Sequence, residues 1–101
     1  MTVLVTIDIP ASRHMLEATA KEMGTSDNPP AGLIVHVATE TATGCRVSDV
    51  WATEEHFIQF RRNRLLPAIS RVREAHGLSD DVESMAPQHT VTDAFDLVRG
   101  R

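Results

Sequence analysis

Apolar residues in the first third of the chain follow two different periods. Residues 2–9 form a β-branched, apolar run, which predicts a strand that ends before the following proline. The i, i+4, i+7 spacing of the next segment predicts a helix that Ser12 caps and that ends at about Met23, before Gly24. The prolines and small polar residues of 25–32 then predict a loop.

Two more strands are predicted in the middle of the chain, over 33–39 and 46–51. The six residues between them form a short hairpin loop, in which Gly44 can adopt a positive φ. Thr53 follows the second of these strands as a helix cap, and the two glutamates after it suit the positive end of a helix dipole.

Proline punctuates the last part of the chain. Pro67 is expected to break or kink the second helix, because proline has no backbone N–H and its ring clashes with the preceding turn. A further helical segment over 68–76 is expected to end at Gly77. The fourth strand is expected within 84–97, in its later part, because Pro87 cannot donate to a strand ladder.

The resulting order, β-α-β-β-α-β, is that of the α+β ferredoxin-like fold, with four antiparallel strands and both helices on one face. The first two strands are apolar on both faces, whereas a sheet with one face in water should alternate apolar with polar residues. We therefore expect the uncovered face to pack against the sheet of a second copy, which gives a homodimer.

Composition narrows the class of protein but names no activity. The 101 residues, 42% hydrophobic and 24% charged, predict a single globular domain over 1–101. The sequence shows neither an apolar run long enough to span a membrane nor the basic start of a signal peptide, and its single cysteine fits a reducing cytoplasm. The net charge of -4 argues against a nucleic-acid-binding surface. We therefore expect a cytoplasmic protein without membrane or nucleic-acid partners.

The length of the hairpin loop decides which side chains lie across from each other. A two-residue loop places His36 opposite Trp51, whereas a four-residue loop places His36 opposite Asp49. In both registers these side chains and Ile34 project from the same face, since strand side chains repeat every two residues. An imidazole, a carboxylate and an indole would then lie together on a mostly apolar surface.

This grouping offers a candidate site. His36 is a candidate general acid or base whose pKa Asp49 would raise. Trp51 would supply a flat wall and an N–H donor for an aromatic ligand, and Phe57 and Phe60 would complete the pocket from the helix side. Each residue also has a structural interpretation: a strand histidine beside a carboxylate is more often a satisfied core or interface pair, and such aromatics are more often core.

Other chemistry-bearing residues add little. The arginines between 61 and 73 form a basic helix surface, of which only Arg64 is spaced to lie near the apolar stripe and bind an anionic substrate group. The remaining histidines lack metal-ligand spacing and no glycine-rich phosphate loop occurs, so we expect neither a metal nor a nucleotide cofactor. Cys45 is expected to be an unreactive thiol beside the hairpin loop.

The region from Gly32 to Val72 combines an apolar strand, a V-S-D-V-W stretch that ends at Trp51, an E-E-H-F stretch followed by Phe60, and an R-L-L-P-A stretch. In this combination it resembles small dimeric α+β barrel proteins related to the antibiotic biosynthesis monooxygenase (ABM) family. The resemblance implies a ferredoxin-like protomer that dimerises sheet to sheet and has a pocket between sheet and helices.

The resemblance also implies an activity, because characterised enzymes of this type oxidise polycyclic aromatic phenols to quinones with dioxygen, without metal or flavin. Trp51 would be the pocket aromatic, whereas the roles of His36 and Asp49 follow from the strand register. We therefore expect a cofactor-independent, monooxygenase-like homodimer that acts on a small apolar or aromatic metabolite. A polyketide cyclase or isomerase of the same fold, or a non-catalytic binding or structural dimer, are the alternatives.

Overall fold

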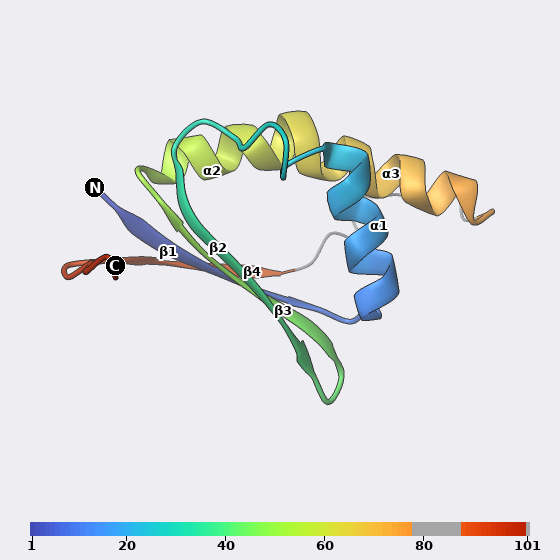
Figure 1. Ribbon diagram of the computed structural model, residues 1–101, viewed down its shortest axis with the longest axis horizontal. Coiled ribbons are helices and arrows are strands. Elements are labelled where there is room, and N and C mark those ends of the chain that lie inside the picture. The colour runs from blue at the N-terminus through green and yellow to red at the C-terminus, as the bar shows by residue number, and fades with distance from the viewer. Residues whose placement is uncertain (78–87, 101) are drawn as a thin grey trace.

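The computed structural model describes residues 1–77 and 88–100 and shows one antiparallel sheet with helices on one of its faces (Figure 1). Its four strands are β1 (Val3–Ile9), β2 (Leu33–Thr41), β3 (Gly44–Trp51) and β4 (His89–Asp93). They lie in the order β2-β3-β1-β4, and every pairing is antiparallel. This order confirms the α+β ferredoxin-like arrangement.

The first helix begins and ends where the sequence predicts. α1 (Arg13–Met23) is capped by Ser12, whose side-chain oxygen accepts a hydrogen bond from the backbone N–H of Met15 at 3.2 Å. Gly24 ends the helix in the left-handed conformation, with a φ of 68°.

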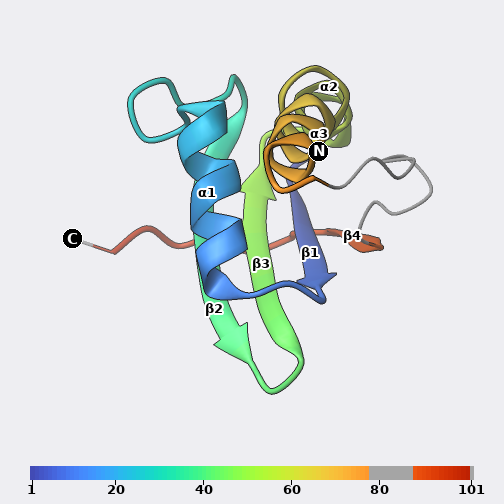
Figure 2. The same ribbon diagram turned by 90° about the vertical axis from the view of Figure 1, so that its right-hand side faces the viewer.

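The second helical region stays helical across Pro67. It consists of α2 (Glu54–Phe60), a π-helical segment, η1 (Arg61–Leu65), and α3 (Leu66–Ala75). The irregularity that proline introduces thus takes the form of a wider turn just before it, and Pro67 itself falls in the first turn of α3, where a missing N–H costs little. Figure 2 shows α1 and this helical region side by side over the sheet.

Only part of the segment expected to contain the fourth strand can be compared with the structure. Residues 84–87 lie outside the described residues, and β4 occupies the later part of the expected range. β4 pairs with β1, with Val91 opposite Val5. Within residues 1–77 and 88–100, no helix is both long and apolar enough to cross a membrane.

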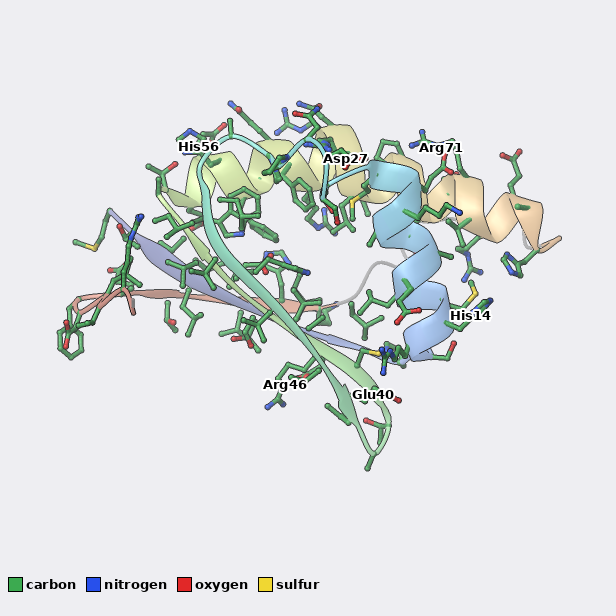
Figure 3. All side chains as sticks on the ribbon, viewed as in Figure 1. His14, Asp27, Glu40, Arg46, His56 and Arg71 are labelled. Atoms are coloured by element: carbon green, nitrogen blue, oxygen red, sulfur yellow. The ribbon has the colours of Figure 1, made fainter. Side chains whose placement is uncertain are left out.

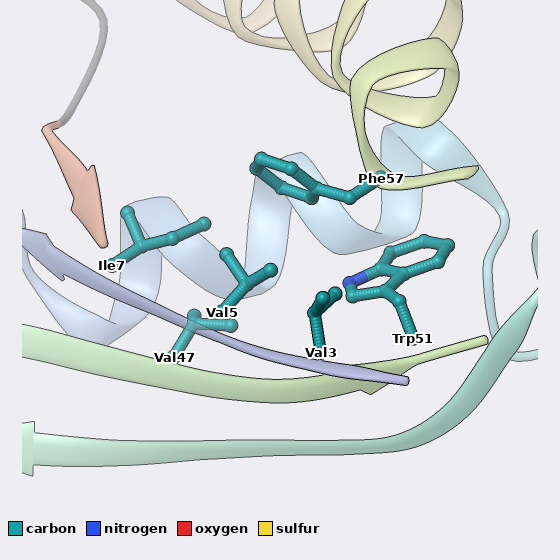
Figure 4. Packing of buried hydrophobic residues seen from close by; sticks show 6 residues of the cluster. All are labelled: Val3, Val5, Ile7, Val47, Trp51 and Phe57. Atoms are coloured by element: carbon teal, nitrogen blue, oxygen red, sulfur yellow. The ribbon is translucent and has the colours of Figure 1, made fainter. Parts of the chain in front are cut away.

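The hydrophobic core lies between the sheet and the helices (Figure 4). Its buried residues come from β1, β3 and α2: Val3, Val5, Ile7, Val47, Trp51 and Phe57. Trp51 contacts two phenylalanine rings, at centroid distances of 6.0 Å for Phe57 and 5.2 Å for Phe60. Aromatic packing of this kind ties α2 to the end of β3.

The other face of the sheet carries apolar side chains that no helix covers. Leu4, Val35 and Val37 are 38%, 41% and 46% exposed, and they pair with Val50 and Ser48, the positions of β3 that alternate with its buried residues. We refer to these three residues and their polar neighbours on that side as the open face. Apolar residues on both sides of β1 and β2 are therefore a feature of the folded chain, as the sequence indicates.

Gly44 fixes how the β2–β3 hairpin meets the end of β1. Its φ is 152°, and a Cβ atom at this position would lie 2.1 Å from the carbonyl oxygen of Ile9. A larger residue would push the two strands apart, because that contact is to backbone rather than to a flexible side chain. The hairpin can therefore pack tightly only with glycine here.

Candidate functional site

The β2–β3 hairpin adopts the register that places His36 opposite Asp49. Thr41 pairs with Gly44, so the chain reverses at residues 42–43, and this register is the same as the one expected for the four-residue loop. The face that carries Asp49 is the helix-facing side, since β3 buries every second residue from Cys45 to Trp51.

A β-bulge removes Ile34 from the face on which it was expected beside His36, Asp49 and Trp51. The register shifts between Leu33 and Val35, so that Leu33, and not Ile34, lies opposite Trp51. A bulge inserts one unpaired residue, and every side chain before it moves to the other face. The pairs that follow one another along this part of the sheet are therefore Glu40 with Cys45, Ala38 with Val47, His36 with Asp49, and Leu33 with Trp51.

His36 and Asp49 form a short hydrogen bond, with 2.6 Å between Nδ1 and Oδ1. The Asp49 side chain is 6% exposed, whereas that of His36 is 52% exposed. Because an ionised carboxylate can only accept, Nδ1 carries the proton of this bond, and the basic lone pair of a neutral ring is then on Nε2. The arrangement holds Nδ1 of His36 in place and leaves Nε2 to exchange protons.

The pair also changes the basicity of the imidazole. The hydrogen bond to Asp49 is the main cause that raises the pKa of His36 above its ordinary value; burial acts in the opposite direction, and the charge of Asp49 adds a further upward contribution. A histidine with a raised pKa is a stronger base near neutral pH, which suits general base catalysis.

This shift predicts a pH-dependent contribution to stability. The folded chain binds the His36 proton more tightly than the unfolded chain, so the contribution is fully present below the ordinary pKa of 6.5 and is lost as pH rises through the raised value. Urea denaturation of the wild type and His36→Gln should show a larger difference in the free energy of unfolding at acidic than at alkaline pH. The matched control is His14→Gln, at an exposed position of α1, and an equal difference at both pH values would contradict the prediction.

A pocket of about 320 Å³ lies between the first half of α1 and the hairpin. Its lining residues come from α1, β2 and β3: Arg13, Leu16, Glu17, Ala38, Thr39, Glu40 and Cys45. Arg13 joins the two sides, with its Nε 2.6 Å from Glu17 and one terminal nitrogen 3.4 Å from Glu40. Figure 3 shows Glu40 on the hairpin, below α1. The volume is in the range of small-molecule sites.

The His36–Asp49 pair is not part of the lining of this pocket and lies one same-face residue pair along the sheet from it. Ala38 lines the pocket and lies two residues beyond His36 on the same face of β2, a spacing of about 7 Å along a strand. Cys45, which is 2% exposed, belongs to the lining and is therefore not simply a loop residue. This pocket could not be predicted from the sequence, because its walls come from segments that are far apart in the chain.

The aromatic residues expected to line a pocket are part of the core. Trp51 is 0% exposed and Phe57 is 1% exposed, and the pocket near α1 is lined by other residues. The Nε1 atom of Trp51 is buried and has no hydrogen-bond partner in the structure, among residues 1–77 and 88–100. His89, one of the histidines that lack metal-ligand spacing, lies edge-on to Phe57 at a centroid distance of 5.0 Å.

Arg64 lies at the junction of two helices. One terminal nitrogen of its guanidinium donates a hydrogen bond of 2.8 Å to the carbonyl oxygen of Met23, the last residue of α1. A cation at the C-terminal end of a helix is favourable, so this contact ties η1 to α1. In the part of the chain that the structure describes, no group of three or more histidine, cysteine or acidic residues is placed to hold a metal ion.

The sequence matches no family model, and no curated protein matches it. Solved structures match it over nearly the whole chain. Rv0793 from Mycobacterium tuberculosis is 17% identical, with 97% of this chain and 98% of that chain covered, at a TM-score of 0.57.

Two further structures point to the same type of fold. SnoaB, a cofactor-independent oxygenase from Streptomyces nogalater, is 14% identical, covers 98% of this chain and 96% of its own, and has a TM-score of 0.55. A protein from Chloroflexus aurantiacus J-10-fl, provisionally assigned as an antibiotic biosynthesis monooxygenase, is 14% identical at a TM-score of 0.56, with 100% of this chain and 97% of that chain covered. The chain therefore has the fold of the ABM-type proteins.

Proposed function

We propose that this protein is a cofactor-independent, monooxygenase-like enzyme that acts on a small aromatic metabolite bound between α1 and the β2–β3 hairpin. The observation that carries the proposal is the His36–Asp49 pair on the helix-facing side of the sheet, one same-face residue pair away from Ala38, which lines a pocket of about 320 Å³. The likeness to SnoaB supports the reaction type, since that protein is a cofactor-independent oxygenase on a similar fold.

The reaction needs a proton acceptor and a dry site more than it needs a redox group in the protein. His36 Nε2 accepts the proton of a polycyclic phenol, and the resulting electron-rich anion reduces dioxygen. One oxygen atom becomes the second carbonyl of the quinone, and the other leaves as water with the two hydrogen atoms that the substrate loses. Asp49 holds the imidazole and stabilises the imidazolium that forms.

Trp51, Phe57 and Phe60 have a supporting place in this proposal. They form the aromatic core at the end of the sheet beyond the His36–Asp49 pair, and they hold α2 against β3 rather than lining the pocket. Arg64 is engaged with α1 in this structure, so we assign it to holding the helices and not to the substrate.

The proposed active form is a homodimer in the cytoplasm, joined through the open face. Leu4, Val35 and Val37 leave apolar surface in water in one protomer, and a second copy of the same face would remove it. A chain of this size buries only a modest share of its surface, which makes self-association a simple way to cover these side chains.

The proposal predicts oxygen-dependent turnover of a polycyclic phenol. With anthrone, the keto form of such a phenol, as the probe, the protein should consume one dioxygen for each anthraquinone formed and release no hydrogen peroxide. The measurement pairs an oxygen electrode with absorbance of the quinone, and the control is the same mixture without dioxygen, in which anthrone should persist.

Other outcomes count against the proposal. If native mass spectrometry of the purified protein shows a retained metabolite that is converted equally well without dioxygen, the protein is a cyclase or isomerase. If it shows no retained small molecule, and anthrone and larger phenols are turned over no faster than in buffer, the protein is a binding or structural dimer.

A further inference from the structure

The pocket between α1 and the hairpin has an apolar floor and a charged rim. Leu16 and Cys45 form the floor, and Cys45 is only 2% exposed. The charged residues of the lining form the rim: Arg13, Glu17 and Glu40, whose side chains are 67%, 62% and 63% exposed. A molecule that enters the pocket from solvent therefore passes these three side chains before it reaches the floor.

Arg13 bridges the two sides of the rim. Its Nε lies 2.6 Å from Glu17 Oε1, one turn further along α1, and a terminal nitrogen lies 3.4 Å from Glu40 Oε1 on β2. The hydrogen bonds, first that to Glu17 and then that to Glu40, raise the pKa of Arg13 above its usual range. The guanidinium is therefore occupied by two carboxylates of the chain itself and is not presented to a ligand anion.

The rim carries more negative than positive charge, since two carboxylates face one guanidinium. Arg46, the next residue after the floor cysteine, does not compensate for the excess: it lies on the opposite face of β3 and pairs with Asp8, 2.7 Å between Nε and Oδ1. His36 and Asp49, two residue pairs further along the sheet, are bonded to each other. The electrostatic potential at the entrance is therefore negative.

One uncompensated charge is enough to discriminate between ligands. Even at the dielectric constant of water, a unit charge about 6 Å from an entering ion changes the local concentration of that ion by roughly 3-fold, and the lower dielectric constant of a protein surface increases the effect. Salt removes the effect, because the Debye length falls to about 3 Å at 1 M ionic strength. Entry of anions should therefore be slowed at low ionic strength and released in concentrated salt.

We propose that Glu17, Arg13 and Glu40 form a charge filter at the entrance of the pocket, which admits uncharged aromatic molecules and excludes those that carry a carboxylate or another anionic group. As a statement about the substrate, this inference rests on the proposed function and narrows it: the phenol enters in its neutral form and loses its proton inside, to His36. As a statement about the pocket, it is tested without turnover.

Alkylation of Cys45 reports entry into the pocket, because it is the only cysteine of the sequence and lies on the floor. Iodoacetamide is uncharged and iodoacetate is anionic, and both alkylate the thiolate. The ratio of their rates, followed by intact mass at alkaline pH, cancels the ionised fraction of the thiol, and the urea-unfolded chain supplies the reference ratio. At low ionic strength, folding should slow iodoacetate at least about 3-fold more than iodoacetamide, and 1 M salt should remove this difference.

Two variants of the rim should change the rate ratio in opposite directions. Glu40→Gln removes the excess negative charge and should bring the ratio to within about 2-fold of that of the unfolded chain, whereas Arg13→Gln leaves two uncompensated carboxylates and should slow iodoacetate by a further factor of about 3. The matched control is Glu22→Gln, which removes a glutamate of α1 outside the pocket, paired with Arg71, and should leave the ratio unchanged.

The same measurements can overturn the filter. A rate ratio in the folded chain equal to that of the unfolded chain contradicts it, and so does an equal effect of Glu22→Gln and Glu40→Gln. A thiol that neither reagent reaches in the folded chain also contradicts it, because the pocket then has no entrance at the rim. Failure to oxidise anthrone, by contrast, counts against the proposed function and leaves the alkylation result unchanged.

Discussion

Replacing His36 by alanine is expected to lower the turnover of anthrone by about 10²- to 10⁴-fold, the range that a positioned general base contributes. In the proposed reaction the imidazole accepts the substrate proton, and its Nδ1 is held 2.6 Å from Asp49 Oδ1. The variant should remain folded, because about half of the side chain is in water. Steady-state kcat/KM, measured with the oxygen electrode, checks the prediction.

Two control variants distinguish a loss of proton transfer by His36 from a loss of its hydrogen bond to Asp49. His36→Gln keeps an N–H donor for the buried carboxylate but cannot accept the substrate proton, so it should be as inactive as the alanine variant. His14→Ala removes an exposed histidine of α1 and should leave turnover unchanged. In the wild type, activity should rise with pH through the raised pKa of His36, as expected when the neutral ring is the active form. Full activity in His36→Gln would show that the imidazole is not the base.

Replacing Trp51 by alanine is expected to cost about 3–5 kcal/mol of the free energy of unfolding, the usual range for deleting a large buried aromatic side chain. The indole is fully buried and contacts the rings of Phe57 and Phe60, so the surrounding residues cannot close the cavity cheaply. A domain of this size is stable by only about 5–15 kcal/mol, so the loss is a large share of the total.

Urea denaturation followed by circular dichroism measures this effect. Trp51→Phe is the matched variant, since it keeps an apolar ring and also removes an N–H that has no partner in the described residues; it should be much less destabilising than alanine. Val35→Ala, on the open face, should lower the free energy of unfolding of the monomer by less than Trp51→Ala or Trp51→Phe does. A loss below about 1 kcal/mol for Trp51→Ala would contradict the core placement.

Local patterns were sufficient to predict the strands, the first helix and the shared face of His36 and Asp49. The helix caps at Ser12 and Thr53 each accept the expected backbone hydrogen bond. The pairing of His36 with Asp49 was one of two registers left open, because alternation along a strand fixes the face of a side chain but not its partner across the hairpin. The contact of Gly44 with Ile9, which holds the hairpin, is not local in sequence.

Features that depend on contacts between distant segments were not predictable in the same way. The bulge after Leu33 lies next to Gly32, where the start of β2 meets α2 and His56 packs directly on the glycine. The pocket depends on Arg13 reaching Glu40 across 27 positions of sequence. Trp51 and Phe57 were correctly taken as aromatic neighbours, but whether such a cluster is a wall or a core depends on how closely the helices approach the sheet.

The π-helical segment η1 also affects how this chain must be compared with related sequences. A π turn holds one residue more than an α turn, so residues before and after it are offset by about 100° relative to a continuous α-helix. Phe57 and Val72, which lie on either side of η1, are both buried. A relative with a regular helix here needs a one-residue gap within 61–65, and an ungapped alignment would match every residue of α3 to the wrong neighbour.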